Sequence, residues 1–185
     1  MIMLVLGSVL AAQEENSRQG RFLFQFGGGP NFPFYDSATE TLFSAIDAQA
    51  GVTRTKLALD LEFGYGLSPT TMFLAGMIGT GDALSYGGNT MQLNLYLYHL
   101  GLRWYPGAKG FYLSGLVGAT KGLLMLNGSA LSGSNFGTGA GLAIGNEFSS
   151  RNRGFTVGLE AATFGGSIEG QFESTVMVTL NLAWR

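Results

Sequence analysis

The sequence predicts an all-β fold: a closed antiparallel transmembrane β-barrel of about eight strands in up-and-down order. Only 12% of the 185 residues are charged, about half of what a soluble domain usually carries. Apolar and polar residues alternate with a period of two along much of the chain. No segment has the roughly 18 consecutive apolar residues of a transmembrane helix. A closed barrel is then the membrane structure that satisfies every backbone group.

The first residues, MIMLVLGSVLAAQEEN, predict a signal peptide. Residues 1–12 form its apolar region, and Val9 and Ala11 are the small residues before a cleavage site. No Lys or Arg precedes the apolar region, as in a signal peptide truncated at its start; a short buried helix is the alternative. We therefore expect a signal peptide over 1–12, an N-terminal periplasmic segment over 13–20 and the barrel over 21–185.

The segment RTKLALDLEFGY, residues 54–65, shows the alternation most clearly. Its leucines and aromatic residues fall on one face of a strand, and its charged residues fall on the other. Wound as a helix, the same segment would scatter its apolar residues over all sides. Seven further segments can be assigned as strands in the same way. The expected strands are Arg21–Gly28, Arg54–Tyr65, Thr71–Gly79, Thr90–Tyr105, Phe111–Thr120, Phe136–Phe148, Phe155–Thr163 and Phe172–Trp184.

The strand expected over 90–105 contains a conflict of parity. Its first half has leucines at odd positions, from Leu93 to Leu97, whereas Leu100 and Leu102 in the second half are at even positions. Three explanations stay open: a β-bulge near Tyr98 and His99, a strand end that projects beyond the bilayer, or Tyr96 and Tyr98 pointing into the lumen.

The connections alternate in length, which supports the barrel independently. Three are short: 66–69, 106–110 and 149–153. Three of the other four, 30–51, 80–89 and 121–135, are longer. Outer-membrane barrels have short periplasmic turns and longer extracellular loops, so both termini should be periplasmic. Within 30–51, residues Ser37–Ala50 are expected to form a short helix with Ser37 as its N-cap and Glu40 three residues later.

Strand charges share the polar parity of their strands, with Lys121 as the exception. An Arg or Lys that faces lipid at the midplane costs roughly 2–4 kcal/mol, so these charges should face the lumen. Small inward residues such as Gly141 and Gly145 suit a narrow barrel whose interior is filled by side chains. We expect a lumenal charge network of Arg103, Glu62, Glu147, Glu160 and Asp60, with Arg103 in reach of at least one glutamate.

Aromatic residues gather beside the short turns and near the C-terminus, which predicts a belt at the membrane interface. The expected members are Tyr65, Trp104, Tyr105, Tyr112, Phe148 and Trp184.

From Arg21 to Arg185 the chain resembles the small outer-membrane barrels typified by the OmpA transmembrane domain, OmpX and OmpW. The resemblance rests on the strand pattern, the alternating turns and the final segment VMVTLNLAWR. That segment looks like the signal read by the barrel-assembly machinery, except that Arg185 follows the terminal aromatic Trp184. The resemblance implies the outer membrane of a diderm bacterium, contact with its lipids, and a monomer.

Few residues suggest chemistry. The chain has no cysteine and one histidine, His99, so the sequence predicts no metal site and no cofactor. The glycine-rich segment 137–145 lies in a strand pattern with no following helix, which argues against a nucleotide site. The net charge of −2 gives no reason to expect nucleic acid. A hydrolytic triad on His99 would need a serine and a carboxylate from other strands, such as Ser114 and Glu62.

We therefore expect a non-enzymatic barrel with a plugged lumen and surface loops that serve adhesion, surface protection or membrane stabilisation. Two alternatives stay open: a lipid A-modifying hydrolase that uses His99, and a narrow channel for small solutes.

Overall fold

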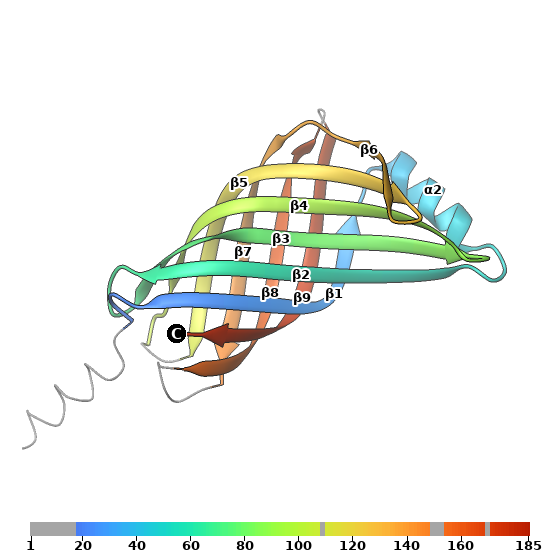
Figure 1. The fold of residues 1–185 in the computed structure, drawn as a ribbon. Coiled ribbons are helices and arrows are strands. Elements are labelled where there is room, and N and C mark those ends of the chain that lie inside the picture. The colour runs from blue at the N-terminus through green and yellow to red at the C-terminus, as the bar shows by residue number, and fades with distance from the viewer. Residues whose placement is uncertain (1–17, 108–109, 149–153, 169–170) are drawn as a thin grey trace, which may run out of the picture.

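The computed structural model describes residues 18–107, 110–148, 154–168 and 171–185, most of which lie in one antiparallel sheet (Figure 1). The expected signal peptide lies outside the described residues and stays a prediction. The helix of the described part is α2 (Ser37–Asp47). The strands are β1 (Phe22–Phe34), β2 (Thr53–Gly66), β3 (Thr71–Tyr86), β4 (Asn89–Trp104), β5 (Phe111–Leu126), β6 (Ser129–Gly133), β7 (Gly137–Glu147), β8 (Phe155–Ile168) and β9 (Gln171–Trp184).

Eight of these strands close into a barrel because the first pairs with the last. β1 runs antiparallel to β9, with Phe24 opposite Trp184, and the other barrel strands pair with their neighbours along the chain. β6 is outside this ring. It pairs with the last residues of β5, from Leu123 to Leu126, whereas β7 pairs with the part of β5 from Phe111 to Thr120. The predicted closed, antiparallel, up-and-down barrel is confirmed.

The described chain ends lie at the same end of the barrel as the short connections. The amide of Gly20 donates to the carbonyl of Gly66, and the backbone of Arg185 exchanges hydrogen bonds with that of Gly154. α2 and β6 lie at the opposite end (Figure 1). By the rule that short turns are periplasmic, the end with α2 and β6 is the extracellular one.

The outward face is apolar. Along β2, Leu57, Leu59 and Phe63 are exposed, whereas Asp60 and Glu62 between them are buried in the interior. The other barrel strands repeat this alternation over the part nearest the short turns. A continuous apolar exterior of this kind is stable against lipid and not against water. None of the helices in the described part of the chain is long and apolar enough to cross a membrane.

Four of the six expected belt aromatics point outward, and two do not. Tyr65, Trp104 and Trp184 are exposed, as is Phe148. Tyr105 and Tyr112 are fully buried inside the barrel, so placing them in the belt was wrong. Their lumenal position follows from strand parity, because Tyr105 lies next to outward Trp104 and Tyr112 lies between outward Phe111 and Leu113.

The extracellular ends of the strands are longer than predicted. β1 continues to Phe34, and the expected loops 80–89 and 121–135 are largely strand. Their turns lie at Gly87–Gly88 and Asn127–Gly128, where all four residues have positive φ, as two-residue hairpin turns of type I′ require. Alternation does not mark these parts, since a strand outside the bilayer need not present one apolar face.

β4 resolves its parity conflict without a bulge. Its register with β3 and β5 is continuous from Met91 to Trp104. Leu95 and Leu97 face the interior, and Tyr98 faces outward, so both the bulge and lumenal tyrosines are wrong. Leu95 and Leu97 lie opposite the buried residues Thr80 and Thr120, and both leucines belong to one buried cluster with Ile78. Leucines therefore help to fill the lumen at this level, whereas paired charges fill it nearer the periplasm.

Lys121, the exception to the charge rule, is opposite Tyr96 on the outward face, and its ammonium group is 5.0 Å from the ring centre of Phe136. α2 begins at Ser37, but its N-cap is Asp36 rather than Ser37 as predicted. The Asp36 carboxylate accepts hydrogen bonds from the Thr39 hydroxyl and from the amides of Thr39 and Ala38. These bonds lower the pKa of Asp36. The helix ends at Asp47 rather than Ala50.

The orientation of β4 predicts how the barrel tolerates charge. Leu100 points outward, roughly 10 Å above Trp104 along the barrel axis, which is near the middle of a 25 Å apolar band. Leu100→Arg should lower the free energy of unfolding in lipid vesicles by about 2–4 kcal/mol. Leu126→Arg, at the exposed extracellular end of β5, should cost less than about 1 kcal/mol because this position lies beyond the apolar band. Urea titration measures both, and equal losses would contradict the assigned membrane level.

Candidate functional site in the barrel lumen

Arg103 is the centre of the lumenal network, with 0% of its side chain exposed. Its Nη2 donates to Glu62 Oε2 at 2.5 Å and to Glu160 Oε2 at 3.2 Å. Its Nη1 donates to Gln25 Oε1 at 2.9 Å, and its Nε donates to Ser114 Oγ at 3.1 Å. The guanidinium group is therefore held through all three of its nitrogens by groups from four other strands, which fixes its position across the lumen.

Strand register explains why these residues meet. Gln25 of β1 is directly opposite Glu62 of β2, and Arg103 of β4 is directly opposite Ser114 of β5. Gln25 also donates to Asp60 Oδ2 at 2.9 Å. Sequence reasoning missed Gln25 and left Ser114 only as a possible nucleophile, although both have the inward parity of their strands.

Tyr112 completes the layer around Arg103. Its hydroxyl donates to Glu160 Oε2 at 2.8 Å, and the Arg103 guanidinium lies 4.0 Å from its ring centre. Gly145 is opposite Tyr112 across the β5–β7 pair, and a Cβ at Gly145 would approach the Tyr112 ring to 2.3 Å. The small inward residue thus provides the room for the large one, and a cation–π contact strengthens the network.

Glu147 belongs to a second layer, nearer the periplasm. It accepts from the Tyr105 hydroxyl at 2.8 Å and from the guanidinium of Arg185, and Arg18 Nη2 is 3.8 Å away. The Arg18 guanidinium stacks 3.5 Å from the ring centre of Tyr105. Among the expected partners of Arg103, the structure therefore places Glu62 and Glu160 in contact with it and Glu147 in a different cluster.

Sequence reasoning missed both basic partners of Glu147. Arg18 was assigned to a periplasmic segment, and Arg185 was read as a departure from the usual terminal aromatic. Arg18 precedes the first alternating segment, so periodicity carries no signal for it, whereas Arg185 continues the inward parity of Asn181 and Ala183. The side chains of Arg18 and Arg185 are 1% and 2% exposed, so the network extends from strand residues to the segments that flank β1 and β9.

His99 faces the lumen one layer above Arg103. Its side chain is fully buried, its Nε2 is 3.9 Å from Glu62 Oε1, and neither ring nitrogen has a hydrogen-bond partner. Ser114, the serine considered for a triad, accepts from Arg103 instead. Asp60 is also buried here, with Oδ2 bonded to Gln25 and Oδ1 without a partner.

Comparison with known proteins supports the fold. No family model matches the sequence, and no curated protein matches it. Among solved structures, Ail, the attachment invasion locus protein of Yersinia pestis, is 13% identical with a TM-score of 0.57, covering 90% of this chain and 99% of that one. Neisserial surface protein A, NspA, is 11% identical with a TM-score of 0.59, covering 88% of this chain and 96% of that one. This chain has the fold of the small outer-membrane barrels.

The extracellular mouth of this outer-membrane barrel has its own polar cluster. Arg54 donates to both oxygens of Asp82, at 2.9 and 2.6 Å, and the hydroxyl of Tyr35 donates to Asp82 at 3.2 Å. Burial and the neighbouring Asp82 raise the pKa of Tyr35. Phe43 of α2 packs against the Tyr35 ring and the Arg54 guanidinium. These contacts hold α2 against the extracellular end of the barrel.

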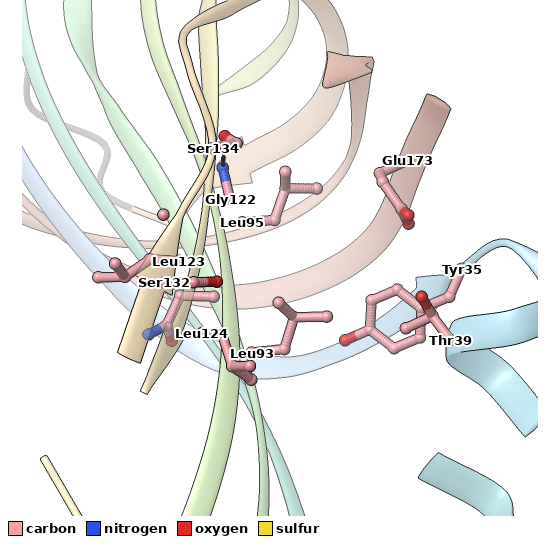
Figure 2. Close-up of a pocket in the computed structure, with 12 residues that line it drawn as sticks. Tyr35, Thr39, Leu93, Leu95, Gly122, Leu123, Leu124, Ser132, Ser134 and Glu173 are labelled. Carbon is pink, nitrogen blue, oxygen red and sulfur yellow. Dashed lines mark hydrogen bonds between the residues drawn. The ribbon is translucent and has the colours of Figure 1, made fainter. Parts of the chain in front are cut away.

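Beside this cluster lies a pocket of about 220 Å³. It is bounded by Tyr35 and Thr39, from the end of β1 into α2, and by the hairpin of β5 and β6 (Figure 2). Figure 2 shows Tyr35, Thr39 and Glu173 on one side, with Leu93 and leucines of β5 on the other. Its lining is mainly apolar, with Glu173 as its charged group. The extracellular mouth of the barrel thus contains a hollow lined by α2, β4 and the β5–β6 hairpin.

The network around Arg103 predicts a large effect on stability. Arg103→Met should lower the free energy of unfolding by about 3–5 kcal/mol, because it leaves Glu62 and Glu160 buried without their cation. Adding Glu62→Gln should recover part of that loss, since one stranded charge is removed. Urea unfolding in lipid vesicles measures both variants, and a midpoint for Arg103→Met equal to that of the unmodified protein would show that the network does not stabilise the barrel.

Proposed function

We propose that this protein is a non-conducting adhesin-type barrel of the outer membrane, in which the lumen is plugged and the extracellular sheet binds a partner. One observation carries the proposal: the wall is much taller on one side than the bilayer requires. β3, β4 and β5 have 16 residues each, whereas about 9–11 suffice to cross a bilayer. β7 has 11 residues. The surplus forms a sheet that projects outside the membrane.

The projecting sheet ends in an open edge. Every residue of β6 is exposed, and among the described strands β6 pairs with β5 alone. An unpaired edge presents a row of backbone donors and acceptors to an extended segment of another protein. Adhesion by addition of a strand is therefore favoured over surface protection or membrane stabilisation, for which the geometry offers no specific feature.

The plug supports the non-conducting part of the proposal. Two layers of paired charges, around Arg103 and around Glu147, cross the lumen within the level of the membrane. His99 is enclosed between strands, where no lipid acyl chain reaches it. A hydrolase for lipid A would need its nucleophile and base on a lipid-accessible face, so the enzymatic alternative has no support from the described geometry. Ail, which shares the fold, is by its name an attachment and invasion protein.

Planar bilayer recordings test the plug. The protein should show no steady conductance, because the paired layers leave no water-filled path. Persistent openings of uniform size would contradict a plugged lumen and favour the narrow channel instead.

Cell binding tests the open edge. Leu131 is 63% exposed on β6, and Leu67 is 52% exposed at a short periplasmic turn. Fluorescent proteoliposomes with the extracellular end outward should bind cultured epithelial cells, and Leu131→Lys should reduce binding at least about fivefold, since edge lysines oppose strand addition. Leu67→Lys is the matched control and should bind normally. Equal binding by all three proteins would place the contact elsewhere.

A further inference from the structure

Asp60, Glu62 and His99 form a compact group of potential metal ligands in the lumen. One ligand atom from each lies within 4.8 Å of the others, and all three residues are buried. Asp60 and Glu62 are alternate residues of β2, and His99 is on β4. β3 separates the two strands, with Gly76 opposite both Glu62 and His99. Strand register alone therefore brings the three side chains to one level of the barrel.

Gly76 lets β2 and the His99 ring approach β3 closely, because a Cβ at this position would lie 2.3 Å from the carbonyl oxygen of Leu61. Gly76 has the inward parity of β3, and a Cβ built on it would lie 3.1 Å from His99 Nε2. Potential ligand atoms in this group lack partners: both ring nitrogens of His99 and Oδ1 of Asp60 have no hydrogen bond. Buried polar groups are nearly always satisfied. Unsatisfied nitrogen and oxygen atoms that converge on one point indicate a missing ligand.

The charge of this layer also favours a cation. Glu62 and Glu160 both contact Arg103, and the Asp60 carboxylate has an oxygen within 4.8 Å of the Glu62 carboxylate. When all three carboxylates are ionised, three negative charges against one positive charge leave an excess of two. Oε2 of Glu62 is engaged by Arg103, while Oε1 is the atom that lies 3.9 Å from His99 Nε2. A dication in the space beside Gly76 would cancel that excess.

We propose that the lumen binds a divalent transition metal of the zinc type through His99 Nε2, Asp60 Oδ1 and Glu62 Oε1, with water as a fourth ligand. A donor set of one imidazole and two carboxylates binds Zn²⁺ in preference to Mg²⁺ or Ca²⁺, which prefer oxygen ligands alone. Ligand atoms around tetrahedral Zn²⁺ are roughly 3.4 Å apart. The ligand atoms here lie within 4.8 Å of one another, so side-chain rotations that move them by about 1 to 2 Å would close the site. The metal would tie β2 to β4 across β3. Composition gives no hint of it, because a single histidine becomes a site only through the register.

Metal retention tests the proposal. The untagged protein is refolded into detergent with Zn²⁺ present, because the site is buried, and is then passed through a desalting column with EDTA. Mass spectrometry of the eluted metal should find about one zinc per barrel. Refolding with Co²⁺ should give visible absorption bands of a tetrahedral site that includes nitrogen. Zinc should also raise the urea midpoint of unfolding.

Two variants and one control identify the ligands. His99→Gln and Asp60→Asn should each retain less than one tenth of the zinc, and their urea midpoints should no longer respond to it. Glu147→Gln changes a buried carboxylate of the other layer, so it should retain zinc like the unmodified barrel. Heat-modifiable migration verifies that each variant is folded. The proposal is overturned if the unmodified protein elutes without zinc, or if folded His99→Gln retains as much as the unmodified protein.

Discussion

A bilayer offers no hydrogen-bond partner to a polypeptide backbone, and the rest of this structure follows from that constraint. Each strand must pair on both edges, so β1 has to meet β9 and the sheet must close. Closure divides every strand into an outward and an inward face. Lipid then admits only apolar side chains outside, which leaves the lumen as the place for the strand charges. The low charge content and the period-two alternation are two results of one requirement.

Once charges are confined to a narrow lumen, they must pair with each other. Arg103 is held by Glu62 and Glu160, and Glu147 is held by the ends of the chain through Arg18 and Arg185. Breaking a buried pair is costly because it strands a charge. In the second layer, Glu147 contacts both Arg185, which follows β9, and Arg18, which precedes β1. Pairing of the first and last strands is thereby reinforced by side chains as well as by backbone bonds.

Sequence reasoning identified the fold and the central glutamate–arginine contacts because both depend on parity alone. Phe22 and Leu180 point outward, and Glu62 and Arg103 point inward, as alternation requires. The same parity should have placed Tyr105 and Tyr112 inside, but their position near the rim suggested a belt. The Asn127–Gly128 turn dipeptide is a local signal for the hairpin of β5 and β6. Arg185 has the inward parity of Asn181 and Ala183, whereas Arg18 had no such signal because it precedes the first alternating segment. The meeting of His99 with Asp60 depends on the register across three strands, which no local pattern specifies.

The barrel separates stability from surface function along its axis. Within the bilayer, each residue has a fixed face and the inward charges around Arg103 and Glu147 are paired, so single changes there act on folding. Outside the bilayer, β3 to β6 are free of the lipid constraint, and both of their faces can carry polar or apolar groups. This explains why alternation fades in these segments and why the pocket beside Glu173 lies there. A partner that binds the projecting sheet would contact residues whose variation leaves the plug intact, and the plug can remain tightly packed because it has no part in that contact.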